Sequence, residues 1–402
     1  MLRKIVVAYS GGLDTSAIIP WLREQYDCEV VAVVGDVGQE AGELEGIEEK
    51  ARQSGATACY VKDLRKPFLE QFVFPALVAG AVYERRYLLG TALARPILAQ
   101  AQVEVAEEVG ADAVAHGCTG KGNDQVRFEG VYAALAPHLD VIAPWREWSM
   151  QSREELLAYL ASHSIPTTSS AEKIYSRDAN LWHISHEGGA LEDPWNEPPE
   201  DVWIRTVSPD NAPARHEDVT IGFENGRPTT LNGQPLEPIE LVETLNDLAG
   251  RHGVGRVDLV ESRLVGMKSR GCYETPGGTV LMEAMDALAE IVLDRPVMQY
   301  REQIAQQYAR LLYDGQWFTA LREIISASIE NMAGRMNGDV VVRLHRGRAM
   351  ATRRRSPQSL YAEQFATFGA DEVYDQSHAE GFIRLHSLPS RIAAMLEQPS
   401  CP

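Results

Sequence analysis

The fold is constrained most by an alternation of short apolar runs with helical patterns over the first 145 residues. The apolar runs cover 5–9, 30–34 and 113–115, and helical candidates lie near 15–26, 40–54, 65–78 and 92–110. Because the runs are continuously apolar, both faces of each predicted strand must be covered, as in a parallel sheet flanked by helices. We therefore predict a doubly wound α/β domain here. Pro20 falls inside the first helical candidate and is expected to kink that helix or shift its start.

The pattern changes after a stretch that is rich in proline. The prolines between about 165 and 215 make a long regular element improbable, so we expect a domain boundary there. They are Pro194, Pro198, Pro199, Pro209 and Pro213. Beyond them, the run 218–224, the pair Asn225-Gly226 and a second polar-apolar run are typical of a β-hairpin. The segments 277–293 and 296–332 have helical patterns, and strands clustered apart from helices predict an α+β domain.

The last part of the chain, from about 356 to 402, contains a short amphipathic helix after Pro389. Leu388, Ile392, Met395 and Leu396 fall on one face of this helix. The segment is too small to fold alone. We expect it to pack on another domain or on another subunit.

Composition excludes several kinds of function. With 402 residues, the chain allows two or three domains of roughly 150 residues each. A net charge of -19 argues against binding nucleic acid or an anionic membrane as the main task. No stretch approaches the roughly 18 apolar residues of a membrane span, and the run 5–9 is too short for a secretory signal. The scattered cysteines form no CxxC pair, which fits a reducing cytoplasm; they are Cys28, Cys59, Cys118, Cys272 and Cys401.

The segment 10–16, Ser-Gly-Gly-Leu-Asp-Thr-Ser, follows the first predicted strand and opens a helix. Its backbone N–H groups and the helix dipole converge on a space that suits an anion. Hydroxyl groups of Ser10, Thr15 and Ser16 can donate to phosphate oxygens, and Asp14 can help to hold Mg²⁺ through water. A tight connection is the plain alternative, but the strand, the hydroxyls and the helix together favour a phosphate site. The turn lacks the lysine of a Walker A loop and is not a GxGxxG fingerprint.

This turn resembles the pyrophosphate loop of the N-type ATP pyrophosphatases, and longer segments narrow the likeness. The segments 86–96, 116–129, 181–187 and 266–276 closely resemble the argininosuccinate synthase family, from Ala8 to the tail motif 373–382. The resemblance implies an adenine nucleotide α hydrolase-like nucleotide domain at 1–168, a synthetase domain at 169–356 and an oligomerisation tail at 357–402. It also implies a cytoplasmic homotetramer that joins L-citrulline to L-aspartate with ATP and Mg²⁺, releasing AMP and pyrophosphate.

The resemblance also carries over site residues, one by one. For ATP these are Ala8, Tyr9, Ser10, Gly11, Gly12, Leu13, Asp14, Thr15, Ser16, Gly35 and Gly117, with Ser10, Asp14, Thr15 and Ser16 as the catalytic set. For citrulline they are Tyr87, Thr91, Asn123, Arg127, Ser176, Ser185, Glu261 and Tyr273, and for aspartate Thr119, Asn123 and Asp124. No protein metal ligand is expected. Ala92 stands where many relatives have Ser, so one hydroxyl contact to citrulline is expected either to be missing or to be replaced by Thr91.

Plainer interpretations stand beside these assignments. The loop glycines can be simple turns, Asn123 and Asp124 can cap the next helix, and isolated charged residues can be solvated. His183 and His186 do not form a recognisable metal motif. The arginines between 343 and 355 are expected to pair with acidic neighbours across a subunit interface rather than to bind RNA. Two alternative interpretations of the whole chain are weighed against this one. The first is an N-type pyrophosphatase that modifies tRNA or takes ammonia from glutamine, and the second is a catalytically silent binding protein.

Overall fold

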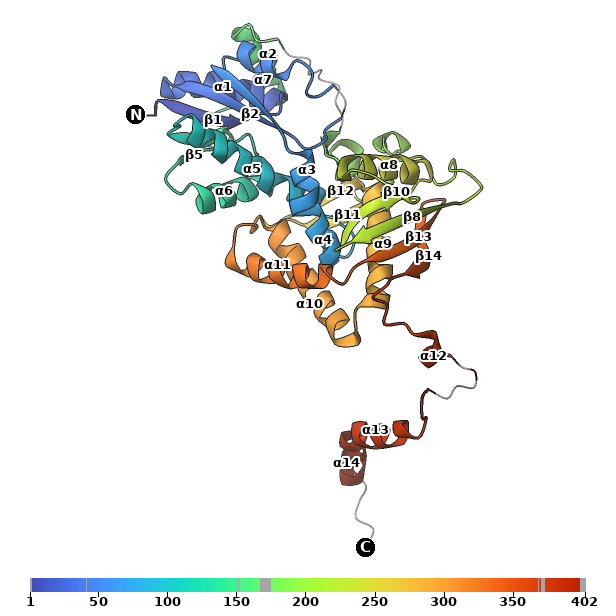
Figure 1. Ribbon diagram of the computed structural model, residues 1–402. Helices are drawn as coiled ribbons and strands as arrows, with labels where there is room; N and C mark the ends of the chain where they lie inside the picture. The colour runs from blue at the N-terminus through green and yellow to red at the C-terminus, as the bar shows by residue number, and fades with distance from the viewer. Residues whose placement is uncertain are drawn as a thin grey trace. The chain divides into compact units, whose positions relative to one another are not determined.

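Five parallel strands form the first sheet, in the order β3-β2-β1-β4-β5 (Figure 1). They are β1 (Lys4–Ala8), β2 (Glu29–Asp36), β3 (Ala58–Asp63), β4 (Ala113–Ala115) and β5 (Asp140–Ile142). Val6 of β1 pairs with Val31 on one side and with Val114 on the other. The three predicted strands are confirmed. The two edge strands were missed because β3 is only partly buried and β5 is three residues long, so neither has a continuous apolar run.

Helices cover both faces of this sheet. The helices of this part of the chain are α1 (Leu13–Tyr26), α2 (Ile47–Gln53), α3 (Arg65–Pro67), the π-helical segment η1 (Phe68–Val73), α4 (Phe74–Ala79), α5 (Gly90–Glu108), α6 (Asp124–Leu135), η2 (Pro144–Arg146) and α7 (Arg153–Ser162). α1, α2 and α7 share one apolar cluster with Val7, whereas α5 and α6 share another with Val6. Since alternate residues of β1 face opposite layers, the predicted doubly wound arrangement is confirmed. α1 begins before Pro20 and continues through it, so its start is not shifted to the proline, and the alternative, a kink at Pro20, stays a prediction.

Two antiparallel sheets follow, in the orders β10-β9-β8-β13-β14 and β11-β12-β7-β6. Their strands are β6 (Ser176–Ala179), β7 (Ile184–Glu187), β8 (Glu217–Glu224), β9 (Arg227–Leu231), β10 (Gln234–Pro235), β11 (Arg256–Ser262), β12 (Lys268–Glu274), β13 (Gly338–His345) and β14 (Arg348–Arg355). The helices are η3 (Gly189–Glu192), η4 (Glu200–Val202), α8 (Pro238–Arg251), α9 (Pro276–Val292), α10 (Arg295–Tyr313) and α11 (Ala320–Ala333). The predicted α+β character and the hairpin at Asn225-Gly226 are confirmed.

The segment 296–332, predicted as one helix, contains two. The break between α10 and α11 includes Gly315, whose φ of 72° favours glycine. A Cβ on Gly315 would lie 2.7 Å from Arg127 Cα, so the break lets this loop approach α6 closely. The largest apolar core joins α4 and α5 with α8 to α11 and with β8 and β13. The first sheet's helices are thus packed on the second region.

The structure, a computed structural model, describes residues 2–40, 42–150, 152–166, 175–367, 369 and 373–397. The predicted boundary between 168 and 169, and Cys401, lie outside these residues. Two compact units occur, Met1–Gln358 and Ser359–Pro402. The second unit contains α12 (Glu363–Ala366), α13 (His378–His386) and α14 (Leu388–Glu397), which confirms the helix predicted near Pro389. In the described parts, no helix is long and apolar enough to cross a membrane.

Candidate active site

The connection between β1 and α1 leaves the amides of a helix N-terminus open. Gly11 has a φ of 71°, and a Cβ at this position would lie 2.4 Å from Ile47 Cδ1. Gly12, the N-cap of α1, has no side chain that could accept from the first amides of the helix. An anion can take that place, and the helix dipole also favours it. This geometry agrees with a phosphate site, and the nucleotide contact itself stays a prediction.

The hydroxyl groups of the turn form two pairs. Ser10 Oγ lies 3.2 Å from Thr15 Oγ1, and Ser10 is exposed, so this pair is accessible to a ligand. Tyr9 Oη lies 3.3 Å from Ser16 Oγ, and both of these residues are buried. A phosphate contact by Ser16 would compete with Tyr9. Ser10 and Thr15 are therefore better placed than Ser16 to donate to phosphate oxygens.

Asp14 is the acidic residue in the first turn of α1. Burial raises the pKa of its carboxyl group, and the positive charge of Arg153 opposes that rise. Mg²⁺ is commonly held by one or two carboxylates together with substrate phosphates. Among the residues that the structure describes, no group of three or more His, Cys, Asp or Glu side chains could hold a metal ion by itself. Asp14 therefore fits a magnesium ion that arrives with ATP.

Different structural features explain why glycine occurs at positions 35 and 117. A Cβ on Gly35 would lie 2.2 Å from Leu98 Cδ2, so close packing against α5 accounts for this glycine. A Cβ on Gly117 would lie 3.1 Å from Thr15 Cγ2, so the loop after β4 passes beside the first turn of α1. The strand order reverses between β1 and β4, the usual ligand position in such sheets. Gly117 lies at that position, and packing alone explains Gly35.

Asp124, at the start of α6, joins the partly buried Arg95 to the buried Arg127. Its Oδ2 accepts a hydrogen bond from Arg95 Nε at 2.9 Å, and its Oδ1 accepts one from Arg127 at 2.8 Å. Burial alone would raise the pKa of Asp124, but the charges of Arg95 and Arg127 hold it below its ordinary value. Asp124 is therefore ionised at neutral pH. A substrate ammonium group at this predicted aspartate site would join an existing cluster of charges.

The loop before α6 contacts the hairpin between β11 and β12. Asn123 Oδ1 accepts a hydrogen bond from the Leu264 amide at 2.9 Å, and the Lys121 carbonyl accepts one from Arg263 at 3.3 Å. Asn123 is buried, whereas Thr119 is exposed. These contacts hold the predicted aspartate site against the sheet that carries the predicted citrulline site. They involve the Asn123 side chain, which the sequence assigned to both substrates.

Several polar side chains share one face of the sheet β11-β12-β7-β6. Ser185 of β7 pairs with Asp178 of β6 on one side and with Tyr273 of β12 on the other. Paired residues point to the same face. Residues two apart along a strand also share a face, which brings in Glu261, paired with Ser269 of β12. The fold therefore brings together Ser185, Tyr273 and Glu261, as predicted, and adds Asp178.

Aromatic rings cover part of this face. Tyr87 and Tyr273 stack with their ring centroids 4.5 Å apart. Gly271 makes room for one of them, because a Cβ there would lie 2.5 Å from the Tyr273 hydroxyl. The Arg127 guanidinium lies 5.0 Å from the centroid of the Tyr313 ring, and its Nε donates to the Tyr313 carbonyl. Burial raises the pKa of both Tyr87 and Tyr273, so their hydroxyls stay protonated.

Glu261 is a buried carboxylate with an unused acceptor. Its residue is 6% exposed, and Oε2 has no hydrogen-bond partner among the described residues. Burial raises the pKa of Glu261, while the nearby Tyr313 hydroxyl and Arg127 charge oppose that rise. Leaving such an atom unpaired is unfavourable. A ligand cation, such as the α-ammonium of an amino acid, would satisfy it.

The Thr91 hydroxyl already has two hydrogen-bond partners in the protein. Its Oγ1 donates to Asp178 Oδ2 at 3.0 Å and lies 2.9 Å from His183 Nε2. A hydroxyl has one proton, so Thr91 can only accept from citrulline. Ala92 is fully buried beside it. Ser176, at the start of β6, is exposed, and its contact with citrulline stays a prediction.

Three residues of this site were missed by the sequence analysis: Arg95, Asp178 and Tyr313. Arg95 lies in the segment 86–96, which carries the family resemblance, so its place in the site could have been predicted from that segment. Asp178 and Tyr313 lie outside the quoted motifs. Their place in the site follows only from strand pairing and from the loop after α10.

His186 and several arginines between 343 and 355, which were not assigned to the site, pair with acidic side chains. His186 Nε2 donates to Glu274 at 2.8 Å, and both residues are fully buried. Arg343 binds Asp218 through two hydrogen bonds at 2.8 and 3.0 Å. Arg354 pairs with Glu290 and Arg355 with Asp339. These arginines therefore pair with acidic side chains of their own chain, so the expectation that they pair across a subunit interface is corrected for the pairs named here.

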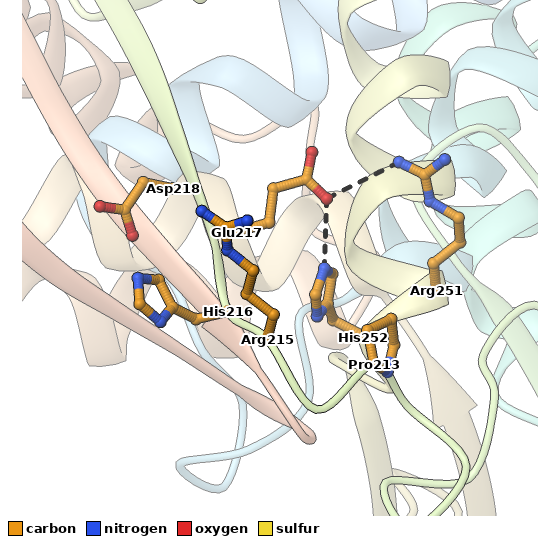
Figure 2. A pocket seen from close by; sticks show the side chains of 7 residues that line it. All are labelled: Pro213, Arg215, His216, Glu217, Asp218, Arg251 and His252. Atoms are coloured by element: carbon orange, nitrogen blue, oxygen red, sulfur yellow. Dashed lines mark hydrogen bonds and ion pairs between the residues drawn. The ribbon is translucent and has the colours of Figure 1, made fainter.

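A cavity of about 620 Å³ lies away from these residues, beside the start of β8 (Figure 2). It is lined by Pro213, Arg215, His216, Glu217, Asp218, Arg251 and His252. Glu217 accepts from His252 Nε2 at 3.2 Å and lies 3.8 Å from Arg251, as the dashed lines show. Glu217 and Asp218 are thus each paired with a basic residue of the same chain. None of the predicted site residues lines this cavity.

The parallel sheet ends in a helix N-terminus at the point where its strand order reverses. This arrangement is typical of nucleotide-binding proteins of the α/β class. Comparison with known proteins gives the particular family. Residues 4–166 match the family described as Arginosuccinate synthase N-terminal HUP domain, and residues 175–393 match Arginosuccinate synthase C-terminal domain. The chain belongs to the argininosuccinate synthase family.

Curated relatives agree over the full length. The argininosuccinate synthase of Pseudoalteromonas atlantica is 62% identical over 394 residues, which cover 98% of this chain and 96% of that protein. That of Idiomarina loihiensis is 62% identical over 397 residues, which cover 99% and 98%. The function of the chain is that of its family, argininosuccinate synthesis, which makes it a ligase of arginine biosynthesis.

Proposed function

We propose that the chain joins L-citrulline to L-aspartate in two steps at the site described above, as a carbon–nitrogen ligase that forms AMP and pyrophosphate. The observation that carries this proposal is Glu261 on an aromatic-lined sheet face: the residue is buried, and its Oε2 has no hydrogen-bond partner among the described residues. The turn between β11 and β12 of that sheet contacts the loop after β4 through Asn123, and the same loop passes beside the β1–α1 turn at Gly117. A nucleotide at the turn and an amino acid at the sheet would therefore be neighbours.

In the first step, the ureido oxygen of citrulline attacks the α-phosphorus of ATP and forms citrullyl-AMP. This oxygen is a weak nucleophile, so most of the acceleration must come from positioning. Glu261 would bind the α-ammonium of citrulline, and Arg127 would bind its α-carboxylate. The first amides of α1, with Ser10 and Thr15, would hold the phosphates. Mg²⁺, near Asp14, would neutralise the pyrophosphate as it leaves.

In the second step, the amine of aspartate attacks the activated ureido carbon and AMP leaves. The amine must be unprotonated to attack, and aspartate carries two carboxylates that need positive partners. Arg95 and Arg127 supply positive charge around Asp124. Thr119 and Asn123 would add hydrogen bonds from the same loop. The protein needs no covalent nucleophile, because the adenylate already provides a good leaving group.

Three further features belong to the proposal. We place the enzyme in the cytoplasm as a homotetramer, with 1–168 as the nucleotide domain, 169–356 as the synthetase domain and 357–402 as the oligomerisation tail. The exposed apolar residues of α13 and α14 support a role for the tail in assembly. The net charge of -19 disfavours tRNA as a substrate.

Product release from ATP and Mg²⁺ tests this function directly. Pyrophosphate and AMP are measured with citrulline and aspartate together and with each omitted in turn. We expect both products only in the complete mixture. Release that is indifferent to the amino acids would instead indicate another acceptor, and ATP binding without turnover would indicate a silent binding protein.

Asp14→Asn tests the role of the turn. We expect pyrophosphate release to fall at least about a hundredfold, because a charged group at the transferring phosphate is lost. Stability should not fall, since burial already disfavours the charged carboxylate. Asp27→Asn, at the other end of α1, is the matched control, because asparagine tolerates the left-handed conformation of Asp27. Equal activity in the two variants would remove Asp14 from the site.

A further inference from the structure

Asp178 lies where the two predicted amino-acid sites meet. Its Oδ2 accepts hydrogen bonds from Thr91 Oγ1 at 3.0 Å and from an Arg95 terminal nitrogen at 2.6 Å. Thr91 and Arg95 are four residues apart in α5, so they lie on the same side of the helix. Asp178 belongs to β6 and shares a sheet face with Ser185 and Tyr273. One carboxylate oxygen therefore joins α5 to the face that carries the predicted citrulline residues.

From Arg95 the contacts continue to the predicted aspartate site. Arg95 Nε donates to Asp124 Oδ2 at 2.9 Å, so Asp124 and Asp178 hold the same guanidinium group. Because a guanidinium group is planar and its N–H bonds are fixed in direction, two such partners set its orientation. Asp124 in turn binds Arg127. Removing Asp178 would release one of the two anchors of Arg95.

From Thr91 the contacts continue to the predicted citrulline site. The Thr91 amide donates to Tyr87 Oη at 3.1 Å, and Tyr87 stacks on Tyr273. A carboxylate can only accept, so the Thr91 hydroxyl proton goes to Asp178 and His183 Nε2 must donate to Thr91.

His183 can hold this role because its ring is neutral. The residue is fully buried, and burial keeps the pKa of His183 well below its ordinary value. Its Nδ1 is then a bare acceptor, and it has no hydrogen-bond partner among the described residues. His183 also packs against Gly90, where a Cβ would lie 2.1 Å from the ring. The threonine hydroxyl is thus held from both sides, by His183 and by Asp178.

We propose that Asp178 is a positioning residue for both amino-acid substrates. Through Thr91 it sets the start of α5 and Tyr87 at the citrulline site, and through Arg95 it sets Asp124 at the aspartate site. The β1–α1 turn takes no part in these contacts. The proposal rests on the proposed function, and it predicts that the KM values of citrulline and aspartate depend on Asp178 whereas the KM of ATP does not.

The test is steady-state kinetics of full-length Asp178→Ala, with each substrate varied in turn. Asp258→Ala is the matched control. Asp258 lies in the same sheet and binds Arg270 through two hydrogen bonds at 2.8 and 2.7 Å, but it pairs with Cys272 and so points to the opposite face from Tyr273. In Asp178→Ala we expect the KM of citrulline and of aspartate to rise about tenfold or more, with the KM of ATP within twofold. In Asp258→Ala all three should stay within twofold.

A double-variant cycle tests whether Asp178 acts through Thr91. Thr91→Val removes the hydroxyl and keeps the shape of the side chain, whereas Thr91→Ser keeps the hydroxyl. If Asp178 acts on citrulline through Thr91, the double variant Asp178→Ala/Thr91→Val should raise the citrulline KM by less than the product of the two single effects. Thr91→Ser should raise the citrulline KM by less than Thr91→Val does, because the hydroxyl that binds Asp178 is kept.

The outcomes separate this proposal from the proposed function. If the unchanged protein shows no dependence on citrulline and aspartate, the proposed function fails and Asp178 has no such role. If the unchanged protein is active but Asp178→Ala keeps all three KM values, the positioning role is wrong. Equal rises in all three KM values with a large loss of thermal stability would mean that Asp178 only supports the fold. An additive cycle would show that Thr91 is not the route.

Discussion

Two buried arginines have nearly the same surroundings and different expected roles. Arg127 is 4% exposed, donates through Nε to the Tyr313 carbonyl at 3.0 Å and binds Asp124 at 2.8 Å. Arg301 is 5% exposed, donates through Nε to the Val78 carbonyl at 2.8 Å and binds Asp286 at 2.9 Å. Burial and pairing are therefore alike. Only the position of Arg127, beside Glu261 and the aromatic face, makes it a candidate for binding substrate.

This similarity gives a controlled prediction. Arg127→Lys should raise the citrulline KM at least about tenfold, because lysine cannot bind a carboxylate through two parallel hydrogen bonds. The KM of ATP should change little. Arg301→Lys should lower thermal stability about as much as Arg127→Lys does, but it should leave the citrulline KM unchanged. Equal kinetic effects in the two variants, measured by initial rates, would mean that Arg127 has only a structural role.

His116 is a second residue whose environment has a measurable consequence. It is fully buried at the end of β4, and its Nε2 lies 3.0 Å from Glu129. Burial, together with the positive charge of Arg146, lowers the pKa of His116 from 6.5 to about 4. Arg146 also pairs with Glu129. The native protein therefore keeps this imidazole neutral under conditions where the unfolded chain protonates it.

Stability should consequently decrease in mild acid. As the pH falls below 6.5, the unfolded state binds a proton that the native state does not bind until about pH 4, so the free energy of unfolding falls through that window. The shift corresponds to about 3 kcal/mol. His116→Gln should remove this part of the dependence, as measured by denaturant unfolding at pH 7.5 and 5. Exposed His138→Gln is the control, and equal slopes for both variants would contradict the assignment.

At the scale of elements, two hairpin turns use the same residue pair. Asn225-Gly226 joins β8 to β9, and Asn232-Gly233 joins β9 to β10, with positive φ at all four residues. This conformation matches the twist of the strands and requires residues that tolerate a left-handed backbone. The two turns differ in their surroundings. A Cβ on Gly226 would lie 2.6 Å from Val78, whereas a Cβ on Gly233 meets no atom within 4 Å.

Alanine at the two glycines separates backbone strain from steric conflict. Gly233→Ala should lower the free energy of unfolding by about 1 kcal/mol, the strain of a left-handed alanine. Gly226→Ala should lower it by about 3 kcal/mol, because the added methyl group must also displace Val78. Denaturant unfolding measures both values. Equal losses would show that the contact with α4 relaxes without penalty.

At the scale of the whole molecule, the tail unit exposes an unusual amount of apolar surface. Phe382, Ile383, Leu385, Met395 and Leu396 are each at least 58% exposed in α13 and α14. Continuous exposed apolar surface of this kind usually marks an interaction site. The proposed homotetramer gives this surface a partner, namely further copies of the same chain.

A double substitution in the tail tests this assembly. Leu385→Asp/Leu396→Asp should reduce the mass in light scattering from four copies of 44.4 kDa to a smaller species, because buried carboxylates disfavour the interface. Arg391→Asp, on the same helix, is the control for added negative charge. An unchanged tetramer in the double variant would place the assembly surface elsewhere. A smaller species in both would mean that charge alone is responsible.

Many local features were predictable because a few neighbouring residues decide them. The β1–α1 turn, the Asn225-Gly226 hairpin and the helix near Pro389 each depend on short-range backbone preferences. The helix boundaries were less predictable where distant packing decides. Pro20 stays inside a continuous helix that packs on the first sheet, and Gly315 breaks a helix so that a loop can approach Arg127.

The sequence by itself determined the doubly wound sheet, the position of the phosphate turn and, through resemblance, the family. It could not determine how the two amino-acid sites are joined, because Thr91 and Asp178 are 87 positions apart and meet only when α5 packs on β6. Likewise, the unpaired oxygen of Glu261 depends on which side chains surround it. Burial and hydrogen-bond direction are properties of the packed chain, so only the tertiary structure decided them.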